Sequence, residues 1–131
     1  MNLFSNVDRT AESAIIVVFG ASGDLSKRKL IPALYQLFAE GLLPDNFTVL
    51  GFARTAFSDD EFRQICYEGI SEYAPEGVKR DIWEQFSHCL FYQAGQYDDR
   101  ASFEALAKRV AELSKERGTS NNRMFYLSTP P

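Results

Sequence analysis

Hydrophobic residues along this chain follow two patterns that alternate from one end to the other. Short continuous apolar runs recur over residues 14–19, 47–53, 89–94 and 123–128. Such runs are typical of strands buried on both faces, as in a parallel sheet. Between them, apolar residues lie three or four positions apart, which predicts helices over about 27–40, 58–73, 78–87 and 99–117.

Each predicted helix carries an apolar face that we expect to point inward. The inward residues are Leu30, Ala33, Leu34, Leu37 and Phe38; then Phe62, Ile65, Cys66 and Ile70; then Val78, Ile82, Trp83 and Phe86; and finally Phe103, Leu106, Ala107, Val110 and Leu113. Ser58 and Glu61 form a capping box, and Asp98 or Asp99 caps the last helix. Pro32 is expected in the first turn of its helix or at a kink, and Gly41 is expected to end that helix.

The alternation of strands and helices predicts the fold class. Parallel strands joined by right-handed crossovers place helices on both faces of the sheet. We therefore expect an α/β fold, a Rossmann-type doubly wound, mostly parallel sheet in three αβα layers. One domain covers residues 14–131, and the polar, aperiodic residues 1–13 are expected to be a flexible leader.

The junction after the first strand is the strongest candidate site. The apolar run ends at Gly20, Gly23 follows three residues later, and a helical pattern then begins. Glycines let a backbone approach a ligand closely, and unpaired amides at a helix start bind anions. The usual dinucleotide fingerprint is G-x-G-x-x-G, but Ser22 stands where its second glycine would be and Ser26 at its last position. The junction is thus either a phosphate seat or a tight turn without a ligand.

Arg54 bears on the choice of coenzyme. In NAD enzymes the end of the second strand commonly carries a carboxylate for the ribose hydroxyls, whereas this chain has Arg54 followed by Thr55. A guanidinium offers a fork of donors to a 2′-phosphate, and Thr55 could add a hydrogen bond, so NADP fits better than NAD. An ordinary surface arginine is the alternative. Residues 27–29, all basic, either raise the local potential for anions or form a solvated helix face.

Composition excludes several other functions. The chain has 131 residues, 45% of them hydrophobic, and a net charge of -4, which argues against nucleic acid as the main partner. No apolar run approaches the roughly 20 residues that span a bilayer, so no membrane partner is expected. Cys66 and Cys89 lack metal or redox spacing and are expected to be buried free thiols in a cytoplasmic protein. The single histidine, His88, makes a histidine-rich metal site impossible.

Four segments of the sequence resemble the N-terminal coenzyme domain of the glucose-6-phosphate dehydrogenase family. Residues 18–30 are similar to its F-G-A-S-G-D-L-A-K-K-K, with Ser26 where the family usually has alanine. Residues 51–54 are similar to its G-Y-A-R, whose arginine holds the NADP 2′-phosphate. Residues 94–99 and 125–131 match two further segments in the same order.

The resemblance implies NADP as oxidant and a hydride taken from C1 of glucose 6-phosphate. It also places Tyr126 near the coenzyme. With the turn and Arg54, the expected coenzyme-binding residues are Gly20, Ala21, Ser22, Gly23, Asp24, Leu25, Ser26, Lys27, Arg54, Thr55 and Tyr126. The backbone amides of about residues 21–25 should hold the pyrophosphate.

No catalytic residue is expected in this chain. The family's E-K-P-F-G and R-I-D-H-Y-L-G-K-E segments and its histidine–aspartate base do not occur here. Removing a hydride from an alcohol needs a base for the hydroxyl proton, so the chain is expected to be an inactive fragment of a larger enzyme. A stand-alone NADP-binding sensor and an interaction module without ligand are the alternatives. An uncovered sheet edge and exposed apolar faces would favour self-association.

Overall fold

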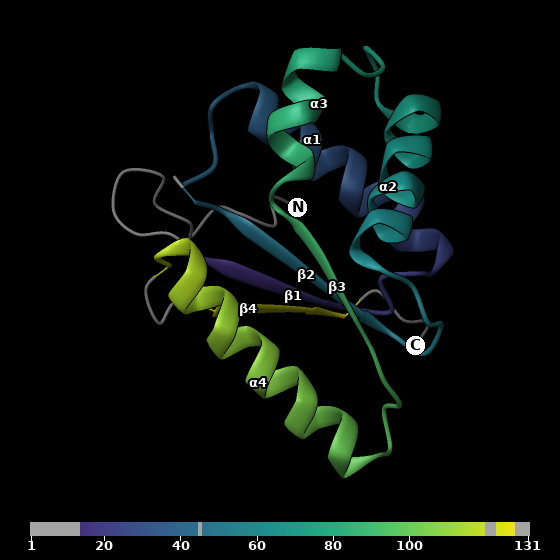
Figure 1. Ribbon diagram of the computed structural model, residues 1–131. Coiled ribbons are helices and arrows are strands. Elements are labelled where there is room, and N and C mark those ends of the chain that lie inside the picture. Colours follow the sequence, from purple (N-terminus) through teal and green to yellow (C-terminus); the bar gives the residue numbers. More distant parts are fainter. Residues whose placement is uncertain (1–13, 45, 120–122, 128–131) are drawn as a thin grey trace.

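The computed structural model describes residues 14–44, 46–119 and 123–127 and shows one parallel sheet between layers of helices (Figure 1). Its strands lie in the order β3-β2-β1-β4, and each neighbouring pair is parallel. The bounds are Ile15–Phe19 for β1, Thr48–Ala53 for β2, Leu90–Ala94 for β3 and Arg123–Leu127 for β4. The chain therefore moves outward from β1 to β3 and then crosses to β4. This order reverses beside β1, where α/β sheets bind ligands.

Helices cover both faces of the sheet, so the prediction of a doubly wound three-layer fold is confirmed (Figure 1). One face carries α1 (Ile31–Ala39), α2 (Asp59–Tyr73) and α3 (Arg80–Ser87), and the other carries α4 (Arg100–Arg117). A short π-helix, η1 (Ser26–Leu30), leads directly into α1. Among the helices described, none is both long and apolar enough to cross a membrane.

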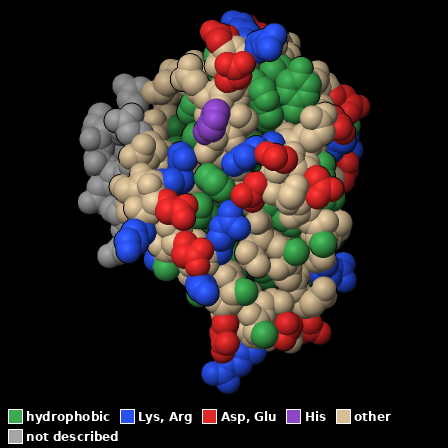
Figure 2. Space-filling view, in the orientation of Figure 1, with side chains coloured by type: hydrophobic (Ala, Val, Ile, Leu, Met, Phe, Trp, Pro, Cys, Tyr) green, Lys and Arg blue, Asp and Glu red, His purple; other side chains and the backbone are tan. Residues whose placement is uncertain are grey.

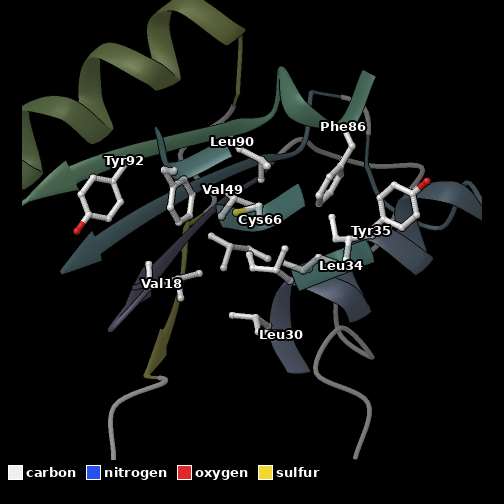
Figure 3. Packing of buried hydrophobic residues seen from close by; sticks show 14 of the residues in the cluster. Val18, Leu30, Leu34, Tyr35, Val49, Cys66, Phe86, Leu90 and Tyr92 are labelled. Carbon is white, nitrogen blue, oxygen red and sulfur yellow. The ribbon is translucent and has the colours of Figure 1, made fainter. Parts of the chain in front are cut away.

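The two central strands, β1 and β2, bury both of their faces, which explains their continuous apolar runs. In β1, Ile16 and Val18 belong to the larger core under α1, α2 and α3, shown in Figure 3. Ile15 and Val17 point the other way, into the smaller core under α4. Because successive strand residues face opposite sides, a strand between two helical layers needs apolar side chains at every position.

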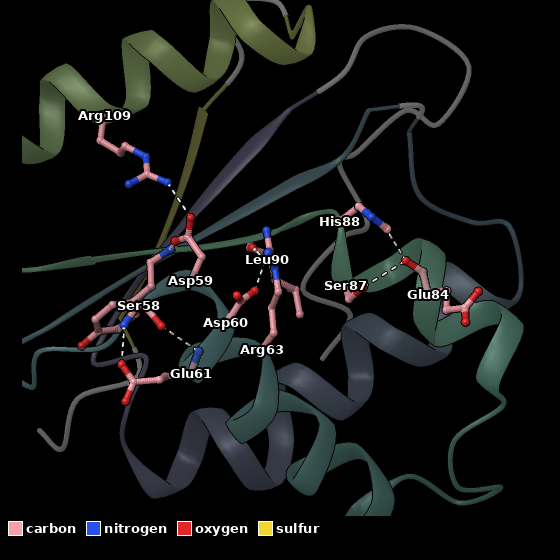
Figure 4. Close-up of polar contacts among 11 residues, drawn as sticks. Ser58, Asp59, Asp60, Glu61, Arg63, Glu84, Ser87, His88, Leu90 and Arg109 are labelled. Atoms are coloured by element: carbon pink, nitrogen blue, oxygen red, sulfur yellow. Dashed lines mark hydrogen bonds and ion pairs between the residues drawn. The ribbon is translucent and has the colours of Figure 1, made fainter.

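The predicted helix ends are confirmed where the sequence carried a specific cap. The Glu61 N–H donates to the Ser58 hydroxyl at 3.1 Å, and the Ser58 N–H donates to the Glu61 carboxylate at 2.9 Å (Figure 4). Asp99, rather than Asp98, caps α4 by accepting from the Ala101 N–H. The segment ending α1 turns at Gly41, whose φ of +71° is in the left-handed region that glycine favours.

The predicted inward face of the first helix is partly wrong. Ala33 of α1 is exposed, whereas Ile31 and Tyr35, which the predicted face did not include, are buried. Helix α3 begins at Arg80, two residues after its predicted start at about residue 78. Pro32 supplies no N–H and its ring would clash with a carbonyl one turn earlier, so the chain widens into η1 just before it. The wider turn rotates the following residues relative to regular helical spacing, which shifts the buried face of α1.

The predicted inward face of α4 is also only partly correct. Leu106, Val110 and Leu113 are buried, but Ala107 is exposed and the Phe103 side chain is 39% exposed. Within the described chain, α4 alone covers its face of the sheet. Phe103 therefore lies at the margin of the smaller core, where a single helix leaves the strand ends partly open.

Candidate functional site

The turn after β1 is held against the end of β2 by backbone hydrogen bonds. The Gly20 N–H donates to the Phe52 carbonyl at 2.8 Å, and the Ala21 N–H donates to the same oxygen at 3.4 Å. Gly20 has a φ of +81°, and the Gly23 N–H closes the turn by donating to the Gly20 carbonyl at 2.9 Å. A side chain at position 20 would be strained in this conformation, which explains the glycine at the end of the apolar run.

The helix that follows presents unpaired backbone amides at the carboxyl end of β1. Its first helical hydrogen bond runs from the Lys27 N–H to the Gly23 carbonyl at 3.2 Å. The amides of Asp24, Leu25 and Ser26 precede that donor, so they have no acceptor within the helix. Such a helix start binds anions through its amides and its dipole.

Fewer backbone amides of residues 21–25 are available to hold a pyrophosphate than the sequence predicted. The Ala21 and Gly23 amides already donate within the turn. The amides of Ser22, Asp24 and Leu25 remain in position for an anion, and all three residues are exposed. The geometry therefore fits a phosphate-bearing ligand at the turn, with fewer donors than the sequence pattern predicted.

A glycine in the middle of β2 brings the turn close to the sheet. A Cβ atom at Gly51 would lie 2.7 Å from the Ala21 Cβ and 2.9 Å from the Phe62 ring. Both distances are well below the ~3.5–4.0 Å of ordinary carbon contacts. Gly51 is therefore required for the turn and α2 to pack on this strand.

Arg54 lies just past the carboxyl end of β2, beside the turn. Its residue is exposed, as is Thr55. Within the described part of the chain, the Arg54 side chain forms no hydrogen bond or ion pair, so its guanidinium is free to bind an anion. The Thr55 carbonyl, in contrast, accepts a hydrogen bond of 2.5 Å from the Tyr92 hydroxyl of β3.

Of the three basic residues at the helix start, Arg28 is the one that pairs with an acidic neighbour in the described part of the chain. Arg28 pairs with Asp24 at 3.2 Å, and its guanidinium lies over the Tyr73 ring at 5.5 Å. The hydrogen bond to Asp24 and its charge raise the pKa of Arg28. Lys27 is half-buried, and its carbonyl would lie 2.6 Å from a Cβ atom on Gly69 of α2. Asp24 is thus a helix-start partner of Arg28.

Ser26 is completely buried, and its hydroxyl has no hydrogen-bond partner. No part of Ser26 reaches the surface at the candidate site, so its predicted role in coenzyme binding stays a prediction. Tyr126 of β4 is half-buried against the larger core, in register with Val18. Its predicted place near the coenzyme stays a prediction.

The segment after β3 behaves as a helix-capping turn. The Gln96 N–H donates to the Ser102 hydroxyl at 2.9 Å, and the Tyr97 hydroxyl donates to the Phe52 carbonyl at 3.4 Å. The Tyr97 ring also packs against Phe52 and Phe19. Residues 128–131, the expected counterpart after β4, lie outside the described residues.

His88 and the two cysteines do not contribute to the candidate site at the carboxyl ends of the strands. His88 follows α3 at the opposite end of β3, where its Nδ1 donates to the Glu84 carbonyl (Figure 4), and it is exposed on the face shown in Figure 2. Burial raises the pKa of both the Cys66 and Cys89 thiols, so they stay protonated at neutral pH. The described residues contain no group of three side chains that could hold a metal ion.

Sequence reasoning missed Tyr92, which packs at the same edge. Its side chain is 3% exposed, and burial, the largest cause, raises the pKa of the phenol to about 12. Tyr97 acts in the same direction, and a hydrogen bond with the Ser22 side chain opposes them. A buried tyrosine hydroxyl must find a partner, and that requirement was the only signal in the sequence.

The comparisons with known proteins agree on one family. The family model for "Glucose-6-phosphate dehydrogenase, NAD binding domain" matches residues 17–131. Glucose-6-phosphate 1-dehydrogenase of Chlamydia pneumoniae is 43% identical over 126 residues, which is 96% of this chain and 25% of that protein. The enzyme of Aggregatibacter actinomycetemcomitans is 46% identical, over 92% of this chain and 24% of its own length.

A solved structure gives the same result. Glucose-6-phosphate dehydrogenase in complex with its substrate glucose-6-phosphate superposes with a TM-score of 0.80 at 36% identity, covering 92% of this chain and 25% of that one. The chain thus spans about a quarter of the length of the relatives it matches.

Proposed function

Because the chain belongs to the glucose-6-phosphate dehydrogenase family, we propose that it is the coenzyme-binding part of such an enzyme and binds NADP. The pyrophosphate lies against the free amides of Ser22, Asp24 and Leu25, and Arg54 binds the 2′-phosphate of the adenosine ribose. Thr55 adds a hydrogen bond beside Arg54, and Tyr126 borders the coenzyme from β4.

One observation carries this proposal: an unpaired arginine lies beside an anion-binding helix start. Gly20 and Ala21 share the Phe52 carbonyl, so the turn after β1 and the end of β2 are fixed to each other. Arg54 follows Phe52 by two residues and has no partner among the residues described. A dinucleotide with a pyrophosphate and a ribose phosphate offers anions to both places.

We propose that the whole enzyme oxidises glucose 6-phosphate to the 6-phosphogluconolactone. NADP, when bound, accepts the hydride, and the residues of this chain bind and orient it. We do not expect His88 to be the base that takes the hydroxyl proton, because it precedes β3 and so lies at the opposite end of the strands from the proposed coenzyme site. The 131-residue chain alone should therefore bind NADP without reducing it when glucose 6-phosphate is added.

The test is calorimetry of the 131-residue chain with NADP and with NAD. Arg54→Ala should weaken NADP binding by about 1.5–3 kcal/mol, roughly 10- to 100-fold, the scale of charge-assisted hydrogen bonds. NAD binding should stay nearly unchanged because NAD lacks the 2′-phosphate.

The matched control is Arg80→Ala, which removes the same charge from α3, where the side chain is 93% exposed. It should leave both affinities unchanged. Equal losses of NADP and NAD affinity in Arg54→Ala, or no preference for NADP in the unaltered chain, would overturn the role of Arg54.

The location and association state of the enzyme are part of the same proposal. Two buried thiols that form no disulfide fit a cytoplasmic protein, and we propose that location. β4 is an edge strand of the described sheet, and its residue Phe125 is 63% exposed. An apolar side chain at an open edge favours self-association of this chain, which analytical ultracentrifugation would measure.

A further inference from the structure

We propose that Tyr92 is a positioning residue that fixes the segment from Arg54 to Phe57 and so sets the preference for NADP over NAD. The inference rests on the proposed coenzyme site, and it deepens that proposal by naming what orients Arg54. Tyr92 itself lies in β3 and is not expected to touch the coenzyme. Its effect is transmitted through the backbone next to Arg54.

Tyr92 holds the connection between β2 and α2 at two points. Its hydroxyl donates to the Thr55 carbonyl at 2.5 Å, one residue after Arg54. Its backbone N–H donates to the Asp59 carboxylate at 2.8 Å, at the first residue of α2. Both ends of residues 55–59 are therefore attached to a single residue of β3.

The phenol itself is held firmly. Its ring packs edge-on against Phe57 with centroids 5.4 Å apart, and at a tilt against Phe62 with centroids 5.1 Å apart. Figure 3 shows Tyr92 at one end of the larger core, with its hydroxyl pointing away from the other residues drawn. A ring fixed on two sides places its hydroxyl in one position, so the Thr55 carbonyl is also fixed.

The second anchor is supported from the other face of the sheet. The Asp59 oxygen that does not bind Tyr92 pairs with Arg109 of α4 at 3.0 Å (Figure 4). The Arg109 guanidinium lies over the Phe91 ring at 5.9 Å. Residues from α2, β3 and α4 thus meet at Asp59, and the α2 end of the segment has little freedom to move.

This arrangement matters because Arg54 has no side-chain partner of its own among the described residues. Its orientation comes from the backbone on either side, which β2 fixes on one side and the Thr55–Tyr92 bond fixes on the other. A guanidinium on a fixed backbone loses less conformational entropy when it binds a phosphate. The gain applies to a ligand with a 2′-phosphate and not to one without it.

The hydroxyl keeps its proton over the whole physiological pH range. Burial raises the pKa of Tyr92 to about 12, so the phenol stays a donor to the Thr55 carbonyl at neutral pH. The Ser22 side chain also acts on this phenol, in the direction that lowers its pKa. Tyr92 therefore lies between the turn after β1 and the segment after β2, the two parts of the proposed site.

The experiment compares Tyr92→Phe with Tyr35→Phe in the 131-residue chain. Tyr35 is an internal match: it is also 3% exposed in the same core, its hydroxyl also bonds to the backbone of a connecting segment, at Lys79, and its ring packs edge-on against Phe86. The two tyrosines lie at opposite ends of the cluster in Figure 3. Each substitution removes one buried hydroxyl and keeps the ring.

The quantity measured is the ratio of the dissociation constants for NAD and NADP, by calorimetry. Tyr92→Phe should lower this ratio by about three- to tenfold, the effect of losing one ordering hydrogen bond. Its NAD affinity should change less than about twofold, and amide hydrogen exchange at residues 55–58 should become faster. Tyr35→Phe should leave the ratio unchanged, although its unfolding midpoint falls as well.

The outcomes separate this inference from the proposed function. The role of Tyr92 is overturned if Arg54→Ala abolishes the preference for NADP but Tyr92→Phe keeps it. It is also overturned if Tyr35→Phe lowers the preference as much as Tyr92→Phe does; in both cases the proposal that the chain binds NADP is unaffected. If the unaltered chain shows no preference for NADP, the roles of Arg54 and Tyr92 are both overturned. Should Tyr92→Phe not fold, Asp59→Ala, which frees the other end of the segment, must lower the ratio; an unchanged ratio there overturns the inference.

Discussion

The substitution Gly51→Ala tests how closely the turn after β1 depends on the sheet beneath it. The added Cβ would lie 2.7 Å from the Ala21 Cβ and 2.9 Å from the Phe62 Cζ. Neither neighbour has free space, since Ala21 is 3% exposed and Phe62 is completely buried. The turn or the ring must therefore move by about 1 Å to restore ordinary contact distances of ~3.5–4.0 Å.

Two effects of that movement can be estimated. Overpacking a dense core by one carbon costs about 1–3 kcal/mol of folding free energy. With a urea dependence of about 2 kcal/mol per molar, a loss of about 2 kcal/mol lowers the unfolding midpoint by about 1 M. Moving the turn also lengthens its hydrogen bonds to a bound pyrophosphate. NADP and NAD affinity should fall together, because both coenzymes share that group, and their ratio should stay the same.

The assay is urea unfolding followed by circular dichroism, together with calorimetry of both coenzymes. Gly77→Ala is the control, because Gly77 has a φ of +69° and open space around its position, away from the site. Left-handed backbone strain should cost it about 1–2 kcal/mol while both affinities stay unchanged. An unchanged midpoint and unchanged affinities in Gly51→Ala would refute the tight contact between strand and turn.

Two further predictions concern stability. Arg117 of α4 donates to the buried Thr48 hydroxyl at 2.6 Å and to the His88 and Phe47 carbonyls at 3.0 and 3.3 Å, so Arg117→Ala leaves acceptors unpaired. Arg117→Ala should lower the free energy of unfolding by about 2–4 kcal/mol. The control is Arg100→Ala, at a 93% exposed residue of the same helix, which should change the urea midpoint little. Equal urea midpoints for the two variants would contradict the role of Arg117. The pKa of Tyr92 lies at about 12 in the folded chain against 10.0 for a free tyrosine, so the unfolded chain ionises first. The contribution of Tyr92 to the free energy of unfolding is complete below about pH 10 and is lost as pH rises towards 12. Unfolding titrations should show a smaller loss of stability over this range in Tyr92→Phe than in the unaltered chain, and equal losses would contradict this.

The sequence by itself determined the elements and the place of the turn. A strand between two helical layers must be apolar at each position, so β1 and β2 were visible as continuous runs. Gly20 was identifiable because a positive φ after a strand favours glycine, and the capping box at Ser58 because its hydrogen bonds join residues three apart. These features depend on neighbours along the chain, and local sequence is enough to specify them.

The tertiary structure alone decided which groups are paired. The Tyr92 hydroxyl and the Thr55 carbonyl are 37 residues apart, the Arg109–Asp59 pair spans 50, and the Arg117–Thr48 bond spans 69. The shifted face of α1 likewise followed from η1, a wider turn that regular helical spacing cannot represent. Hydrogen bonds between distant residues depend on how strands and helices pack against each other. For that reason the sequence could point to Arg54, and only the packing of β3 against the segment after β2 revealed what orients it.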